Sequence, residues 1–369
     1  MTKITDAEIE RLQGRLGSLI NPGAEPYLTE VTRDAIRHWA WGTGDRNPLY
    51  LDRKYAQAAG YGDVIAPPAM LYAFSRNSVG YSGGLPGVHS AFGGSWWKWH
   101  TPLTIGMEIS AKTIFTELKD MPSRFAGRMF KQVAQTRFVD QNDRLVAEVE
   151  SWGLRFERAA ARERNQAAEK PAPAEVPKLT AEQIAEIVKA YRQEADTPQS
   201  SPQWDAIAIG ADLPSIIRGP YSSTCAVAFE QAWGGSYIWA HGYWYDFYSR
   251  HPGASLYNEQ GVPEAAEAVH WDARAAKRAG VASSYDFGPE RVAWMATLLT
   301  NWAGPRALLS ELYCEVRRFN VSGNVTRCTG RIQSTEVIEG CGQVQVALTA
   351  IDSKGETTAS GWAKLRFAL

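Results

Sequence analysis

Residues 38–60 read "HWAWGTGDRNPLYLDRKYAQAAG", and this stretch returns in altered form later in the chain. Residues 230–239 read "EQAWGGSYIW" and, after an insertion, residues 269–280 read "VHWDARAAKRAG". An Ala-Trp-Gly step and an alanine-rich run ending in glycine therefore occur twice in the same order. Such a repeat predicts two copies of one structural unit.

The spacing within the two copies also matches. Asp52 and Gly60 are eight residues apart, and so are Asp272 and Gly280, with helix-forming sequence between them. An aspartate directly before a helical run is a good N-cap, because its carboxylate accepts hydrogen bonds from the first free N–H groups. We expect Asp52 to superpose on Asp272 and Gly60 on Gly280.

Each copy is followed by an apolar helix and then by strand-like sequence. The matching segments are 66–78 and 288–304 for the helices, 95–115 and 312–333 for the first two strands, and Gly106 and Gly323 for the turns between those strands. A long apolar helix followed by antiparallel strands, twice over, predicts an α+β fold in which each sheet wraps its helix. The alternative is two unrelated α+β domains with chance similarity.

The bulk composition fits a globular protein that has no polyanionic partner. Of the 369 residues 44% are hydrophobic and 21% are charged, and the net charge is −1, so no nucleic-acid partner is expected. No apolar run is long enough to span a bilayer, so no membrane association is expected. The four cysteines show no CxxC spacing, which argues against zinc and redox motifs and favours reduced thiols in a cytoplasmic protein.

One segment has the composition of a connector. Residues 157–178 are charged, rich in alanine and proline, and free of aromatic residues. The run after it has apolar residues at helical spacing and predicts a packed helix without a functional role. We therefore divide the chain into an N-terminal domain at 1–157 with the expected active site, a linker with a connecting helix at 158–204, and a C-terminal domain at 205–369 with a degenerate site.

Several of these segments together resemble the MaoC-like dehydratases and (R)-specific enoyl-CoA hydratases in their double hotdog form. The segments that carry the resemblance are "GDRNPLYLD", "AAGYGDVIAPPAMLYAF", "WWKWHTPLTIGMEI", "VHWDARAAKRAG", "LLTNWAG" and "RRFNVSGN". The resemblance covers about 20–157 and 205–369. It implies two hotdog domains packed as a pseudo-dimer, and a substrate carried as a thioester on coenzyme A or acyl carrier protein.

In that family the working motif is Gly-Asp-x-Asn-Pro-(Leu/Ile)-His-x-Asp, whose Asp and His activate water and move a proton. This chain matches it at Asp45, Asn47, Pro48 and Asp52, but Tyr50 stands where the histidine belongs. In the second half the position that matches Tyr50 is His270. The acid is missing there, and aligning "AWGTGD" with "AWGGSY" puts Ser236 or Tyr237 in its place.

Each motif residue has a functional and a structural interpretation. Asp45 is either a general base near the β carbon of a thioester or a turn acid that binds backbone N–H groups; we favour the base. Asn47 is predicted to position the loop. Tyr50 either donates a hydrogen bond to bound water or fills the pocket, since a phenol with a pKa near 10 is a poor base. His270 is either a proton shuttle or a capping or core group, and we expect it to be remote from Asp45.

The start of the first apolar helix is the predicted site for the thioester carbonyl. A helix N-terminus offers free N–H groups to a developing oxyanion. Pro67 and Pro68 have no N–H, so we expect Pro68 to begin the helix and Ala69 and Met70 to be the donors. The alternative is that the prolines only start the helix.

Two aromatic segments remain open to two interpretations. In "SWWKWH" the side chains of Trp97 and Trp99 share one face of a strand and form either core or the wall of an acyl tunnel. The insertion at 238–262 either covers the degenerate second site or reshapes the entrance to the first one.

The hypothesis from the sequence is an enzyme, a hydratase or dehydratase, that adds or removes water at a 2,3-enoyl or 3-hydroxyacyl thioester. No metal and no redox cofactor is expected, the substrate is an acyl-CoA thioester, and double hotdog units can pair as homodimers. The alternatives are a non-catalytic acyl-thioester binding protein or supporting dehydratase subunit, and a thioesterase or atypical lyase on the same fold.

Overall fold

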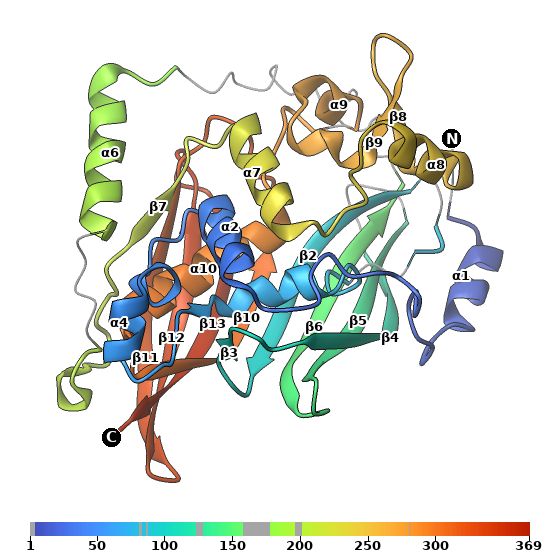
Figure 1. Cartoon of the computed structure of the whole chain (residues 1–369). Helices are drawn as coiled ribbons and strands as arrows, with labels where there is room; N and C mark the ends of the chain where they lie inside the picture. The colour runs from blue at the N-terminus through green and yellow to red at the C-terminus, as the bar shows by residue number, and fades with distance from the viewer. Residues whose placement is uncertain are drawn as a thin grey trace.

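The computed structural model describes residues 4–80, 83–85, 88–122, 128–157, 178–195, 201–279 and 281–369. Its centre is one antiparallel sheet of nine strands in the order β4-β5-β6-β2-β10-β13-β12-β11-β7. The helices α2, α7 and α10 lie together on one face of this sheet (Figure 1). The structure is therefore α+β, as predicted, but the strands of the two halves form one continuous sheet.

The strands of the large sheet are β2 (His89–Trp99), β4 (Ile109–Met121), β5 (Met129–Asp140), β6 (Leu145–Phe156), β7 (Ile216–Arg218), β10 (Ala307–Val316), β11 (Thr326–Ile338), β12 (Cys341–Ile351) and β13 (Thr357–Ala368). Two small sheets consist of β1 (Ile65–Ala66) with β3 (Leu103–Thr104), and of β8 (Ser255–Tyr257) with β9 (Pro263–Ala265). The α-helices are α1 (Asp6–Gln13), α2 (Arg33–Thr43), α3 (Pro48–Leu51), α4 (Arg53–Ala58), α6 (Ala181–Ala195), α7 (Ser223–Trp233), α8 (His241–Arg250), α9 (Ala273–Arg278) and α10 (Gly288–Ala303). Short 3-10 helices are η1 (Pro68–Phe74), η2 (Trp204–Ala206), η3 (Pro252–Ala254) and η4 (Ala266–His270).

The internal repeat extends to the irregularities of the sheet. Strands β4 and β11 both have 13 residues, and each has one bulge, after Phe115 in β4 and after Ile332 in β11. The turn before β6 is closed by the carboxylate of Asp140, and the turn before β13 by that of Asp352, each accepting two backbone N–H groups. Matched bulges and matched turns show that the halves are two copies of one unit.

The two copies meet edge to edge at β2 and β10. Trp96 of β2 pairs with Tyr313 of β10, and these two residues occupy the same position in the aligned strand segments of the two halves. A residue that pairs with its own counterpart lies on a pseudo-two-fold axis. The halves therefore form a pseudo-dimer within one chain.

The helices α2 and α7 repeat this symmetry above the sheet and cross closely. Trp39 of α2 lies edge-on to Phe229 of α7, with ring centroids 5.9 Å apart. A Cβ atom at Gly42 would come within 2.6 Å of the Ala232 Cβ atom and within 2.8 Å of the Ala228 carbonyl oxygen. Glycine at position 42 is therefore required by the approach of the two backbones.

The helix after each motif differs between the halves, and the prediction of two long helices is wrong for the first half. In the second half, α10 has 16 residues and is almost wholly buried. In the first half, η1 is a 3-10 helix of seven residues. It stops because Ser75 adopts an extended conformation and the side chain of Arg76 binds the second half, where its Nη1 donates to the carbonyl of Ser236 at 2.7 Å.

The predicted N-caps are confirmed. Asp52 accepts hydrogen bonds from the N–H groups of the second and third residues after it, and Asp272 does the same. The helices that they begin, α4 and α9, both have six residues. Gly60 ends the first of these segments with a left-handed backbone, at φ +98°, whereas Gly280 lies outside the described residues.

The connector between the halves is described only from 178 to 195 and from 201 onward, so most of the predicted linker lies outside the described residues. Its helix α6 is less packed than predicted, since Ile184 and Val188 are 49% and 40% exposed. It is held by the Tyr191 hydroxyl, which donates to the Gly219 carbonyl at 2.7 Å, and by Glu194, whose carboxylate is bound by a side chain of the second half.

No helix in the described part of the chain has the length and apolarity to cross a membrane. All four cysteines are free thiols.

Candidate active site at the Asp45 loop

The motif loop follows directly from the end of α2. Gly44 caps this helix in a left-handed conformation, at φ +70°, which turns the chain so that Asp45 points inward. Asp45 is 4% exposed. One carboxylate oxygen, Oδ1, accepts the N–H of Asn47 at 2.9 Å, which is the turn interaction expected of an acid in this sequence.

The second carboxylate oxygen is bound by the other half of the protein. Thr297, in the middle of α10, donates its hydroxyl to Oδ2 of Asp45 at 2.8 Å. Asn47 donates its side-chain amide to Oδ1 of Asn301 at 3.1 Å, and its own Oδ1 caps α3 by accepting the N–H of Leu49. The predicted positioning role of Asn47 thus has a structural basis, because it ties the loop to α10.

Behind Asp45 lies a buried ion pair that the sequence did not reveal. Arg218 of β7 forms two hydrogen bonds of 2.8 and 2.9 Å with the carboxylate of Glu194, and both side chains are almost fully buried. The Nε atom of Arg218 also donates to the carbonyl of Thr43, at the end of α2. Because Glu194 belongs to the connecting helix, that helix takes part in the surroundings of the site.

Burial raises the pKa of Asp45 above its ordinary value. The hydrogen bonds from Asn47 and Thr297 and the positive charge of Arg218 act in the opposite direction, and the charge of Glu194 adds to the rise. A rise in the pKa of a buried carboxyl makes it a stronger proton acceptor when it is ionised, which is the direction that a general base needs.

Tyr50 lies in the same buried region and cannot act as a base. It is 3% exposed and is hydrogen-bonded to the side chain of Thr300. Burial, with the nearby charge of Asp45, raises the pKa of its hydroxyl further above the ordinary value. Tyr50 can therefore only donate a hydrogen bond or fill space, the two roles that the sequence left open.

At the start of η1, one of the two predicted N–H donors is already used. The N–H of Met70 donates to the carbonyl of Pro67 at 2.9 Å, so Met70 does not offer a free donor, contrary to our expectation. Pro68 begins the helix, and its carbonyl accepts the indole N–H of Trp99. The N–H of Ala69 has no hydrogen-bond partner within the described part of the chain, and Ala69 is 1% exposed.

His270 lies in the second half, at a different place from Asp45. Its Nδ1 is 2.9 Å from the carbonyl oxygen of Tyr285, and its ring stacks on Phe287 with centroids 3.8 Å apart.

The structure gives Asp45 a different counterpart in the second half from the predicted Ser236 or Tyr237. Helices α2 and α7 both have 11 residues and end at left-handed glycines, Gly44 and Gly234, so the residue after the cap is Gly235.

The aromatic segments have packing roles. Trp97 stacks on Trp99 with centroids 5.4 Å apart, and both are buried in the main core. The insertion forms α8, η3 and β8, and it is anchored by the Trp244 indole, which donates to the carbonyl of Pro263 at the start of β9. Tyr237 at its start stacks on Phe247 and lies under the guanidinium of Arg76.

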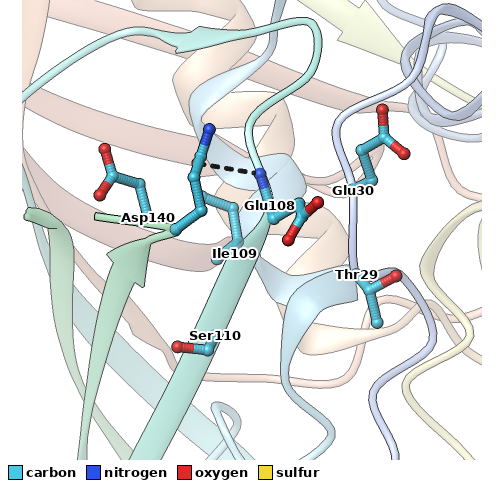
Figure 2. Close-up of a pocket in the computed structure, with 7 residues that line it drawn as sticks. Thr29, Glu30, Glu108, Ile109, Ser110 and Asp140 are labelled. Atoms are coloured by element: carbon cyan, nitrogen blue, oxygen red, sulfur yellow. Dashed lines mark hydrogen bonds between the residues drawn. The ribbon is translucent and has the colours of Figure 1, made fainter. Parts of the chain in front are cut away.

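A hollow of about 430 Å³ lies away from this loop, beside the ends of β4 and β5 (Figure 2). It is lined by Thr29, Glu30, Glu108, Ile109, Ser110, Asp140 and Gln141. Its lining is acidic, and the carboxylate of Asp140 is already paired with Arg144. An acidic lining disfavours the phosphates of coenzyme A, so this hollow does not suit the carrier of a thioester.

Comparisons with known proteins agree with this architecture. Residues 22–149 match the model of the FAS1-like dehydratase domain region. A UPF0336 protein of Thermobifida fusca is 33% identical over 117 residues, which are 30% of this chain and 76% of that protein. The chain belongs to the family of this UPF0336 protein.

Solved structures confirm that MaoC-like chains share this fold as a whole. A MaoC-like dehydratase aligns over 97% of this chain and 99% of its own length, with a TM-score of 0.66 and 17% identity. A Mycobacterium tuberculosis protein described as having a double hotdog fold aligns over 95% of both chains, with a TM-score of 0.55 and 13% identity. The predicted double hotdog is therefore confirmed.

Sequence similarity to other relatives is confined to shorter segments. A UPF0336 protein of Streptomyces avermitilis is 46% identical over 59 residues, which are 16% of this chain and 38% of that protein. The alpha subunit of a 3-oxo-4,17-pregnadiene-20-carboxyl-CoA hydratase from Mycobacterium tuberculosis is 40% identical over 50 residues, 14% of this chain and 16% of that subunit. The chain thus matches well under two thirds of the length of these two relatives.

Proposed function

We propose that this MaoC-like protein adds water to 2,3-enoyl thioesters, or removes it from 3-hydroxyacyl thioesters, with coenzyme A as the carrier. The observation that carries the proposal is the Asp45 carboxyl, which is buried, has a raised pKa, and is held by hydrogen bonds from both halves. The position of this residue in the motif and the names of the relatives support the same class of reaction.

In the proposed hydration, Asp45 first acts as a base. Its carboxylate takes a proton from water while the water oxygen bonds to C3, and the π electrons of the C2=C3 bond move into the thioester enolate. The N–H of Ala69 donates a hydrogen bond to the enolate oxygen, and Tyr50 donates one to the water. The Asp45 carboxylic acid then returns its proton to C2, which leaves one water added and Asp45 restored.

The experiment follows the loss of enoyl absorbance when the purified chain is mixed with crotonyl-CoA. We expect turnover by the natural chain, and a loss of at least about a hundredfold in Asp45→Asn, the usual worth of a positioned general base. Tyr50→Phe should cost less, because it removes one donor and keeps the packing. Asp52→Asn is the matched control, since asparagine also caps a helix and Asp52 lies outside the site.

Two results would contradict the proposal. Absence of turnover with crotonyl-CoA and with longer, branched and aromatic enoyl thioesters would exclude the activity. Full turnover by Asp45→Asn would exclude Asp45 as the base.

We also propose that the reaction needs no metal or redox cofactor, so EDTA treatment should leave the rate unchanged.

A second candidate function is that of a supporting or acyl-binding subunit. It is favoured by Tyr50 in place of the motif histidine, and by the fact that one relative is the alpha subunit of a hydratase. Binding of crotonyl-CoA without turnover would support it. Release of free thiol from the thioester would instead indicate a thioesterase.

A further inference from the structure

The second half has lost the motif acid, but another carboxyl occupies the corresponding place. The residue after the left-handed cap of α7 is Gly235, which has no side chain. Glu230, in the last turn of α7, reaches past the cap, and its Oε1 accepts the N–H of Ser236 at 3.2 Å. In the first half, Oδ1 of Asp45 likewise accepts an N–H from the loop just after the cap. A carboxyl is thus restored from the preceding helical turn.

Glu230 is buried, and part of it has no partner. It is 6% exposed, and its Oε2 has no hydrogen bond within the described part of the chain. The indole Nε1 of Trp233, one turn further along α7, is also buried without a partner in the described residues. Buried polar atoms are nearly always hydrogen-bonded, so two orphans three residues apart on one helix indicate a place that a ligand fills.

The length of the helix in the opposite half explains why Glu230 is not satisfied. Asp45 receives the hydroxyl of Thr297 from the third turn of α10. The counterpart helix η1 ends at Phe74, so it supplies no such side chain to the second half. Arg76 follows this end, but its Nη1 donates to the carbonyls of Gly234 and Ser236 and leaves Oε2 of Glu230 unpaired.

The histidine of the motif is kept on η4, the short helix whose Glu267 is close enough to Glu230 for its charge to act on that carboxyl. Because a carbonyl only accepts, the contact with Tyr285 places the proton of neutral His270 on Nδ1 and leaves the lone pair on Nε2. His270 stacks on Phe287, and Phe287 packs against Trp233 with centroids 5.5 Å apart. His270 is also more open to solvent than Tyr50, its counterpart in the first half.

We propose that Glu230 and His270 form a second acid–base pair, which hydrates 2,3-enoyl thioesters in the C-terminal half. This inference rests on the proposed function and assigns a second site to it. The acid comes from α7 instead of from the motif loop, which is why the motif alone suggests a dead site.

The protonation states fit this pair. Burial, with the nearby charge of Glu267, raises the pKa of Glu230 to about 8, so it is a neutral acid at pH 7. Burial lowers the pKa of His270 to about 4, so its ring is neutral. The water oxygen bonds to C3 while its proton passes to Nε2 of His270. The π electrons of C2=C3 move to C2, which takes the proton of Glu230. Transfer of the proton from His270 to Glu230 then restores both groups, and one water has been added.

The test uses the full chain with crotonyl-CoA in the Asp45→Asn background, where the first pair is disabled. We expect a measurable residual turnover that falls by at least about tenfold when Glu230→Gln or His270→Asn is added. Glutamine keeps the acceptor for Ser236 but has no acidic proton. The matched controls are Glu264→Gln and His251→Asn, which change the same residue types in the same half and should leave the residual rate within twofold. His270→Gln and circular dichroism guard against loss of folding.

The outcomes separate the two proposals. A residual rate that is absent, or unchanged by Glu230→Gln and His270→Asn, overturns the second pair and leaves the proposed function intact. A residual rate that depends on both residues supports it. Full turnover by Asp45→Asn that is lost in Glu230→Gln would remove Asp45 from the reaction and keep the second pair. Absence of turnover by the natural chain overturns both.

Discussion

Asp45 and Glu230 present carboxyls at corresponding places of the two halves, and their surroundings differ. Both oxygens of Asp45 accept hydrogen bonds, and a buried arginine stands behind it. Glu230 has one bound oxygen and one oxygen without a partner among the described residues, and its pKa is raised to about 8. The source of the difference is the helix that each half receives from the other. The full-length α10 satisfies Asp45, and the short η1 leaves Glu230 open.

This comparison shows how a repeat can diverge without losing its fold. The sheet, its bulges and its helix caps are kept in both halves, whereas one helix is shortened and one loop gains an insertion. The number of hydrogen bonds that each carboxyl accepts depends on the helix that the other half supplies. A half cannot therefore be judged active or inactive from its own motif.

The largest expected effect comes from breaking the ion pair behind Asp45. Arg218→Met removes the cation that neutralises Glu194 and opposes the raised pKa of Asp45. Leaving a buried charge without its partner costs about 3–5 kcal/mol. Urea denaturation should show a loss of this size. Arg218→Met combined with Glu194→Gln should recover much of it, and a double variant as unstable as Arg218→Met would contradict the pair.

The sequence was sufficient to predict most of the fold but not this part of the site. Matched spacings around Asp52 and Asp272 anticipated the repeat, because a cap and a turn depend on local sequence. The contacts of Arg218 with Glu194 and of Thr297 with Asp45 join residues far apart in the chain, and nothing in their local sequence signals them.

Two features of the structure differ from the sequence-based predictions for local physical reasons. The helix after Pro68 was expected to be long because its residues are apolar, but the extended Ser75 and the tertiary contacts of Arg76 end it at Phe74. The place of the missing acid in the second half is assigned to Ser236 or Tyr237 by the sequence, because two Ala-Trp-Gly steps align. The helix caps shift that alignment by two residues.

The next effect is a pH dependence of stability caused by Glu230. Its pKa is about 8 in the folded chain and near 4.5 in the unfolded chain, so between these values the folded chain holds a proton that the unfolded chain has released. Stability should therefore fall as pH rises from about 5 to 8, by roughly 3 kcal/mol. The charge of Glu267 increases this effect and that of Arg76 reduces it. Unfolding midpoints of Glu230→Gln should vary less with pH, and an equal slope would show that Glu230 is ionised when folded.

A smaller effect on stability is expected at Asp45, where both carboxylate oxygens accept hydrogen bonds. Thr297→Val keeps the shape of α10 and removes the hydroxyl that binds Oδ2 of Asp45. Loss of one partner of a buried carboxyl should cost about 1–3 kcal/mol at pH 7, measured by urea denaturation. Thr43→Val is the control, since its buried hydroxyl donates to the carbonyl of Trp39 within α2. Equal losses in both variants would argue against a special bond to Asp45.

The smallest effect should be the same in both halves. Asp52→Ala and Asp272→Ala each remove two hydrogen bonds to backbone N–H groups at the start of a six-residue helix. Each N-cap is worth about 1 kcal/mol, so the two variants should lose similar stability in urea. The double variant should lose the sum, because the caps belong to separate halves and share no bonding partner. Clearly unequal losses would mean that the halves have diverged even where their geometry coincides, and the carboxyls could then no longer be compared through the repeat.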